Sequence, residues 1–227
     1  MKKIPFGKPL IGENEKKEIG KVLDSHILTH GPKCIEFEDE FKKFVGTKHA
    51  ITTSNCTTAI HLCLEVLGIK NNDEVIVPAM THVATAHAVE HTGAKPVFVD
   101  VNEKTGCISI DKIEKAITSK TKAIIVVHFV GLPCEMDKII KIAKKNNLKI
   151  IEDSATALGA MFKEQRTGSI GDFGCFSFYP TKHITSMEGG MIVTNSDEYA
   201  SKIKKIKAFG YNKNLNERSL PGLYDID

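Results

Sequence analysis

Residues 74–101, EVIVPAMTHVATAHAVEHTGAKPVFVDV, contain the pattern that decides the fold. A short apolar run at 74–79 is followed by a helix-like segment at 82–93 and by a second apolar run at 95–101. Near-continuous apolar strands joined through a helix are typical of a parallel sheet that is covered on both faces. This stretch therefore predicts one β-α-β unit.

The same alternation extends in both directions along the chain. Further strand-like runs lie at 49–54, 122–131, 149–155, 175–180 and 190–195. Further helix-like segments lie at 57–68, 109–117, 135–147 and 197–210, and two N-terminal helices are expected at 14–25 and 34–46. We predict an α/β fold in which a mostly parallel mixed sheet is flanked by helices.

Composition restricts the classes of function. The 227 residues are 41% hydrophobic and 26% charged, as in a globular protein that buries a core, and the net charge is +3. The nearly balanced charge and the lack of a helix-turn-helix signal argue against a nucleic-acid partner. The lysines at 202, 204, 205 and 207 are interpreted as one solvated helix face.

Several features favour a cytoplasmic protein without a membrane partner. No run approaches the roughly 18 apolar residues that a membrane span needs, and residues 1–18 lack the apolar stretch of a signal peptide. The cysteines are scattered without a CxxC pair, which suits reduced thiols and predicts no metal site. They are Cys34, Cys56, Cys63, Cys107, Cys134 and Cys175.

Small polar residues follow two of the predicted strands, where ligands gather in parallel sheets. SNCTTA (54–59) opens a helix, and its free N–H groups, together with the hydroxyls of Thr57 and Thr58, could hold a phosphate. A plain helix cap is the alternative. His82, near the start of the next helix, could serve as a base or as a platform for a flat ring, or could only pack or cap.

Two further features carry charge. Glu152 and Asp153 end a strongly apolar strand, and alternation places their carboxylates on opposite faces. A buried carboxylate needs a partner, either a protonated ring nitrogen or an ordinary salt bridge or cap. Lys182 lies between two apolar runs, where burial would lower its pKa and expose a nucleophilic amine able to form a Schiff base. Together, a phosphate cradle, a ring platform, an acid and a lysine are the groups that pyridoxal phosphate (PLP) requires.

The ordered blocks of the chain carry a resemblance to a known family. They include VGTKHAITTSNCTTAIHLCL (45–64), IIEDSATALGA (150–160) and GSIGDFGCFSFYPTKHITSMEGGMIVTN (168–195). The chain resembles the DegT/DnrJ/EryC1/StrS sugar aminotransferases over essentially its whole length, with a local likeness to the perosamine-synthase type. The resemblance implies the large domain of the aspartate-aminotransferase fold (PLP fold type I).

The resemblance also implies roles for single residues. Lys182 matches the lysine that binds the cofactor and moves protons, and Asp153 matches the acid paired with the pyridine nitrogen. Three residues match phosphate ligands, namely Cys56, Thr57 and Ser177. His82 falls where the family stacks an aromatic ring on the cofactor, and Thr156 falls where many members have Gln or His near the phenolic oxygen.

The activity that the resemblance implies is transfer of an amino group from L-glutamate to a nucleotide-linked 4-keto-6-deoxy sugar, for surface polysaccharide or glycan synthesis. One branch of the family has histidine at the position of Lys182 and dehydrates its sugar, so a dehydratase is one alternative. A truncated, inactive paralogue that binds a ligand or regulates a partner is another.

Length and assembly complete the expectations. Residues 1–227 are expected to form a PLP-binding large domain with an N-terminal helical segment, and the polar stretch 211–227 predicts that the C-terminal small domain of the family is absent. The family works as a dimer with active sites at the interface, so we expect a homodimer with shared active sites.

Overall fold

The computed structural model describes residues 3–5, 7–25 and 27–210. The polar stretch 211–227, on which the expectation of a truncated chain partly rests, lies outside the described residues.

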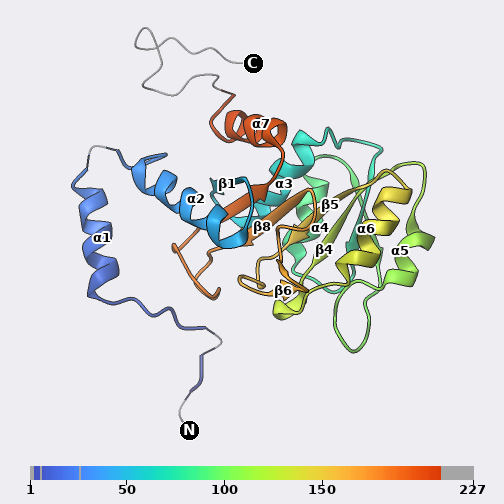
Figure 1. The fold of residues 1–227 in the computed structure, drawn as a ribbon, viewed down its shortest axis with the longest axis horizontal. Helices are drawn as coiled ribbons and strands as arrows, with labels where there is room; N and C mark the ends of the chain where they lie inside the picture. Colours follow the sequence, from blue (N-terminus) through green and yellow to red (C-terminus); the bar gives the residue numbers. More distant parts are fainter. Residues whose placement is uncertain (1–2, 6, 26, 211–227) are drawn as a thin grey trace.

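A seven-stranded mixed sheet forms the centre of the described part of the molecule (Figure 1). Its strands, in the order in which they lie side by side, are β1 (His49–Thr53), β9 (Gly190–Thr194), β8 (Phe173–Ser177), β5 (Lys149–Asp153), β4 (Thr121–Val127), β2 (Glu74–Pro78) and β3 (Lys95–Val99). β9 is antiparallel to both of its neighbours, and every other pairing is parallel. Six strands therefore run in one direction, which confirms the predicted mostly parallel mixed sheet.

Both faces of this sheet are covered, as the alternating pattern predicts, by helices α2 (Pro32–Val45), α3 (Cys56–Val66), α4 (Val83–Glu90), α5 (Ile110–Ala116), α6 (Met136–Lys145) and α7 (Asp197–Lys207). They are preceded in the chain by α1 (Glu13–Leu23). In Figure 1, α1 stands apart from the sheet, and none of its described residues is buried. Among the described residues, no helix is both long and apolar enough to cross a membrane.

Local chemistry sets several helix ends. Asn55 caps α3 by accepting the Thr58 N–H at 2.8 Å, and Ser196 caps α7 by accepting the Tyr199 N–H at 3.2 Å. Pro32 occupies the first position of α2, where its missing N–H has no intrahelical partner to lose. Gly46 ends the same helix in the left-handed region, at φ 85°, which glycine adopts without steric cost.

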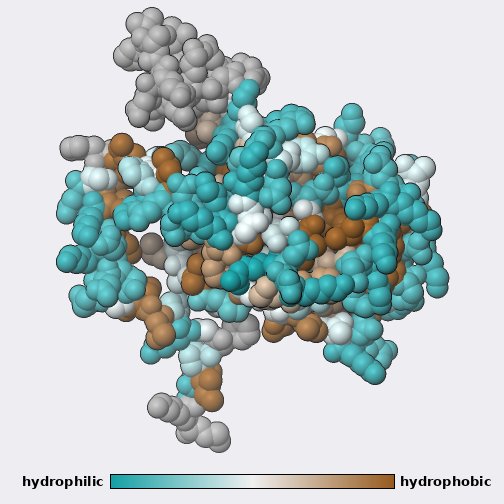
Figure 2. Space-filling view, in the orientation of Figure 1, coloured by the Kyte–Doolittle hydropathy of each residue, from teal (hydrophilic) through white to brown (hydrophobic). Residues whose placement is uncertain are grey.

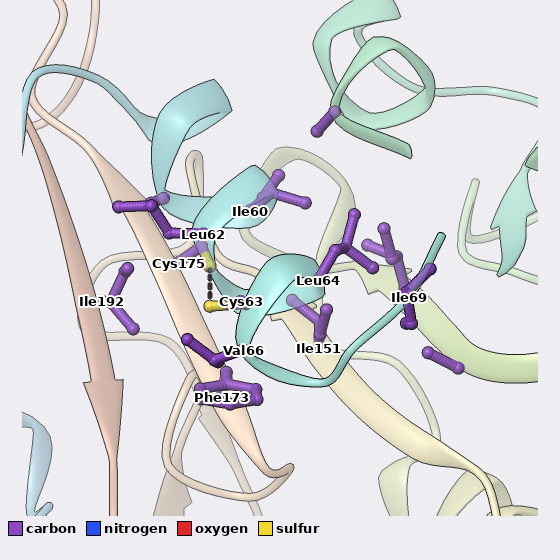
Figure 3. Close-up of a cluster of buried hydrophobic side chains, with 14 of the residues drawn as sticks. Ile60, Leu62, Cys63, Leu64, Val66, Ile69, Ile151, Phe173, Cys175 and Ile192 are labelled. Atoms are coloured by element: carbon purple, nitrogen blue, oxygen red, sulfur yellow. Dashed lines mark hydrogen bonds between the residues drawn. The ribbon is translucent and has the colours of Figure 1, made fainter. Parts of the chain in front are cut away.

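One face of the sheet packs against α3, α4 and α7. Alternate strand residues such as Ile125 and Ile151 lie with Leu64 of α3 and Ile203 of α7 in one buried cluster. Figure 3 shows part of this cluster, in which the Cys63 and Cys175 sulfurs are 3.7 Å apart. All six cysteines are free thiols, as expected, and five of them are buried.

The opposite face is covered in two parts. α5 and α6 cover strands β2, β4 and β5, with Ile113 and Ile139 fully buried against Ile124. α2 covers β8 and β9, where the Phe41 and Phe176 rings meet edge to face with centroids 5.0 Å apart. Because helices cover the sheet on both faces, side chains on both sides of the central strands are buried, and these strands contain near-continuous apolar runs.

The structure corrects some predicted boundaries. The expected strand 122–131 ends at Val127, because Val130 and Gly131 take positive φ values of 51° and 88° and turn the chain away. The expected strand 175–180 begins earlier, at Phe173, which pairs with Ile151, and ends before the proline at 180. A small hairpin of two-residue strands, β6 (Met161–Phe162) and β7 (Gln165–Arg166), is too short to leave a periodic signal.

Candidate functional site

The strand directions bring the predicted site residues to one edge of the sheet. Because six strands are parallel, their carboxyl ends meet at the same edge, and β9 begins there. The residues at this edge include Thr53, Pro78, Val127, Asp153 and Ser177 at strand ends and Gly190 at the start of β9. The segments that follow these strands carry the remaining predicted residues, with Cys56 and Thr57 in the first turn of α3.

A glycine sets the closest packing at this edge. Gly190 pairs with Thr53 on one side and with Ser177 on the other. A Cβ atom placed on Gly190 would lie 2.5 Å from the backbone carbon of Asn55, closer than any real contact. The absence of a side chain therefore lets β9 lie directly against the start of α3, and it brings Ser177 into the row of residues next to that helix.

The start of α3 offers backbone donors. The Thr58 N–H donates to the Asn55 side chain and the Ala59 N–H donates to the Asn55 carbonyl at 3.1 Å. The N–H groups of Cys56 and Thr57 precede this first intrahelical bond and point out of the helix start, where an anion is favoured. Burial raises the pKa of the Cys56 thiol well above its usual range, so the thiol stays neutral.

Asp153 lies buried at the end of β5, where each carboxylate oxygen accepts one described donor. The Thr85 hydroxyl donates to Oδ2 at 2.9 Å and the Ala155 N–H donates to Oδ1 at 3.1 Å. Burial raises the pKa of Asp153, while these two donors and the Lys182 charge oppose that rise. A carboxylate oxygen has two lone pairs, so a further cationic donor can be accommodated.

Glu152 lies on the other face, as strand alternation predicts, and has a structural role. Its Oε2 accepts from His128 Nε2 and the Gly168 N–H, both at 2.8 Å. Its Oε1 accepts from the N–H groups of Ile170 at 2.7 Å and Gly171 at 2.6 Å. All four lone-pair sites of this fully buried carboxylate are therefore used to hold the segment that leads into β8.

Lys182 lies in the connection between β8 and β9, with its N–H bonded to the Tyr179 carbonyl at 2.9 Å. Its side chain is half-buried, so the closed apolar setting expected from the sequence is only partly present. The charges of Lys182 and Asp153 both affect the pKa of the Cys56 thiol. The structure thus brings together the predicted lysine, the predicted acid and the predicted phosphate cradle.

The two remaining predicted residues occupy the same edge. His82 is exposed and caps α4, accepting the Ala84 N–H on Nδ1 at 3.2 Å, so the capping alternative describes its present contact. Its role as a ring platform stays a prediction. Thr156 donates to the His128 carbonyl at 3.4 Å, which places it between the ends of β4 and β5, and its contact with a cofactor is likewise untested.

Sequence reasoning missed Thr85 and His128. Thr85 contacts Asp153 from within α4, although it lies 68 positions away along the chain. His128 accepts the Cys134 N–H on Nδ1 at 3.1 Å, so its proton resides on Nε2 and points to Glu152. Thr85 is a polar residue between two alanines in the predicted helix, and this feature could have drawn attention to it. His128 directly follows an apolar strand-like run, and this position could have drawn attention to it.

Comparison with known proteins agrees with this geometry. The aminotransferase from Psychrobacter cryohalolentis superposes with a TM-score of 0.91 and 38% identity, over 96% of this chain and 57% of that chain. The Escherichia coli GDP-4-keto-6-deoxy-D-mannose-3-dehydratase with bound hydrated PLP gives a TM-score of 0.88 and 34% identity, over 93% and 56%. GDP-perosamine synthase of Caulobacter vibrioides is 42% identical over 93% of this chain and 57% of its own length.

These superpositions define the class, an α/β aminotransferase fold of the PLP-dependent type. The model of the DegT/DnrJ/EryC1/StrS aminotransferase family matches residues 9–222, and the chain belongs to that family. The chain spans little more than half the length of these relatives.

Replacement of Gly190 tests the close packing at the cradle. In Gly190→Ala the new methyl group meets the rigid Asn55 backbone, so we expect the free energy of unfolding to fall by roughly 1–3 kcal/mol. Gly189→Ala is the matched control, because its methyl group meets the hydroxyl of Ser186, which can rotate away. Urea unfolding of both variants measures the difference, and equal losses would contradict the proposed packing.

The raised pKa of Asp153 predicts a pH dependence of stability. The folded state binds this proton more tightly than the unfolded state, so the stability that Asp153 contributes is lost as pH rises above its ordinary value of 3.8. We expect Asp153→Asn to gain stability relative to the parent chain as pH increases through the raised pKa. Urea unfolding at a series of pH values measures this difference, and a pH-independent difference would refute the assignment.

Proposed function

We propose that residues 1–227 form the PLP-binding large domain, with an N-terminal helical segment, of a PLP-dependent aminotransferase. The enzyme would move an amino group from L-glutamate to a nucleotide-linked 4-keto-6-deoxy sugar for surface polysaccharide or glycan synthesis. The observation that carries this proposal is the meeting of Lys182, Asp153 and the start of α3 at one sheet edge.

The residues present fit PLP. The Cys56 and Thr57 N–H groups suit its phosphate, with the Ser177 hydroxyl from β8 as a further ligand. Asp153 is a buried carboxylate whose described donors leave a lone pair on each oxygen, and such a group is stabilised by a protonated ring nitrogen. When bound, this cofactor supplies an electron sink for chemistry at the amino carbon.

The protein residues have separate tasks in this proposal. The Lys182 amine would hold the cofactor at its aldehyde group and would move the proton during amino transfer. Asp153 would keep the ring nitrogen protonated, His82 would serve as the platform for the ring, and Thr156 would be available to the phenolic oxygen. Glu152 and His128 keep the end of β5 in place, so that Asp153 keeps its direction.

Lys182 also favours amino transfer over dehydration. The dehydratase alternative requires a histidine at this position, whereas this chain has lysine there and histidine only at 183. The relatives include both a GDP-perosamine synthase and a dehydratase that acts on a GDP-linked keto sugar, which supports a nucleotide-linked sugar as substrate for either reaction. The presence of both Lys182 and Asp153 disfavours the third alternative, an inactive paralogue.

A homodimer with shared active sites in the cytoplasm is part of the proposal. α1 has no buried residue, and it exposes Ile19 and Leu23. The Lys182 connection exposes Ile184 and Met187 beside the site. Figure 2 shows hydrophobic side chains on the surface of the N-terminal part of the chain. Six free thiols suit a reducing compartment.

Light scattering on the purified chain tests the dimer. Exposed apolar side chains favour association, so we expect a mass of two chains at micromolar concentration. Leu23→Lys combined with Ile184→Lys should shift the mass toward one chain, whereas Lys16→Glu on the polar side of α1 should not. A single-chain mass for the unmodified protein at all concentrations would contradict the dimer.

The absorbance spectrum of the chain with added PLP tests the activity. We expect a visible band that disappears in Lys182→Ala, remains in the control Lys202→Ala, and bleaches on addition of L-glutamate. A folded chain that gives no band dependent on Lys182 would contradict the proposal and favour the inactive paralogue.

The products distinguish the two reactions. With L-glutamate and GDP-4-keto-6-deoxy-D-mannose as the probe substrate, mass spectrometry should detect an aminated sugar and 2-oxoglutarate. A sugar that has lost a hydroxyl group instead of gaining an amine would establish the dehydratase alternative.

A further inference from the structure

A line of hydroxyl groups leads from the start of α4 to the carboxylate of Asp153. Thr81 Oγ1 lies 2.9 Å from Thr85 Oγ1, and Thr85 Oγ1 lies 2.9 Å from Asp153 Oδ2. Thr85 is fully buried, Asp153 is 7% exposed and Thr81 is half-buried. The line therefore connects the outer end of the helix to a carboxylate that water hardly reaches.

The direction of donation in these two hydrogen bonds follows from the number of protons on each hydroxyl group. A threonine hydroxyl has one proton, and that of Thr85 is directed to the ionised carboxylate, which can only accept. The bond between the two threonines must then be donated by Thr81 and accepted by Thr85. Both bonds point toward Asp153, and each polarises the next, so the pair stabilises the negative charge more than one hydroxyl would.

None of the other groups that face Asp153 adds a negative charge. They are Lys182 from the β8–β9 connection, His128 from the end of β4, Cys56 from α3 and Cys175 from β8. Burial raises the pKa of both the Cys56 and the Cys175 thiol, so both are neutral. Nδ1 of His128 accepts the Cys134 N–H, its Nε2 lies 2.8 Å from Glu152 Oε2, and its electrostatic influence favours the ionised form of Asp153. The ionised form of Asp153 is therefore favoured by two donors, of which Thr85 is the side-chain donor, and by Lys182 and His128.

The same short stretch also places His82. His82 lies between the two threonines in the sequence and caps α4, because its Nδ1 accepts the Ala84 N–H. Residues 81–85, at the start of α4, thus position both the exposed imidazole of His82 and the Thr85 hydroxyl that donates to Asp153.

We propose that Thr85, supported by Thr81, is a positioning residue for Asp153, which keeps this carboxylate ionised and turned to accept an N–H from a protonated ring nitrogen. The effect of Thr85 on the Asp153 carboxylate does not depend on a bound ligand and can be measured in the ligand-free chain. Only the identity of the donor, a protonated ring nitrogen, rests on the function proposed above.

The experiment is a pH titration of the Asp153 carboxyl carbon by NMR in the ligand-free chain, with the signal assigned by its loss in Asp153→Asn. Thr85→Val keeps the branched shape and removes the hydroxyl, so the titration should move to higher pH. Thr85→Ser keeps the hydroxyl without the methyl group and should restore it toward the parent. Thr81→Val should shift the titration in the same direction but by less, because it removes only the second bond.

The outcomes separate this inference from the proposed function. An unchanged titration in a folded Thr85→Val chain, or an equal shift in Thr85→Ser, would overturn the positioning role. Once the titration shift is established, PLP affinity near neutral pH should fall about tenfold in Thr85→Val and recover in Thr85→Ser. A titration shift in a chain that binds no PLP would leave the role of Thr85 intact and refute the proposed function alone.

Discussion

The difference between two adjacent buried carboxylates organises this molecule. Glu152 accepts four donors, two on each oxygen, whereas Asp153 accepts one described donor on each oxygen. A buried carboxylate with every lone pair used is a fixed structural element, and its loss would leave three backbone N–H groups without their acceptor. Glu152 thereby ties the segment that leads into β8 to the end of β5. Asp153 points to the other face of the sheet with part of its hydrogen-bonding capacity available, and strand alternation alone assigns the two roles.

The fold was largely predictable because its signals are local. Each strand is covered on both faces and reads as an apolar run, and the helices between them show amphipathic periodicity. The reversal of β9 was not predictable in the same way, since a strand has the same apolar pattern in either direction. The short connection 178–189, which has no helix of its own, is the physical reason for the reversal, because a parallel crossover usually needs a helix-length connection. The hairpin of β6 and β7 left no signal because two-residue strands have no period to detect.

The candidate site was predictable only in outline. Parallel strands predict that residues after different strands meet at one edge, and the structure places Cys56, Asp153, Ser177 and Lys182 there. The contacts that tune the site could not be predicted, because they join positions far apart along the chain. Thr85 and Asp153 are separated by 68 positions, and Gly190 reaches the backbone of Asn55 from across the sheet. The burial of Lys182 was overestimated, since apolar flanking runs show where the strands lie and not how deep the loop between them sits.

The incomplete burial of Lys182 bears on how the site would work. Thr85, Asp153, Glu152 and Cys56 are all fixed by bonds or by close packing inside the sheet and its helices. Lys182 instead lies in a connection that exposes Ile184 and Met187. In the proposed function the start of α3 and Asp153 would hold the ligand, and Lys182, which lies in a less buried connection, would move the proton. Exposure of the apolar side chains of this connection to water is unfavourable, and such surfaces are often covered by a partner. A second copy of the chain that covered these side chains would also exclude water from the Lys182 amine. The same surface would then serve both dimer formation and the reaction.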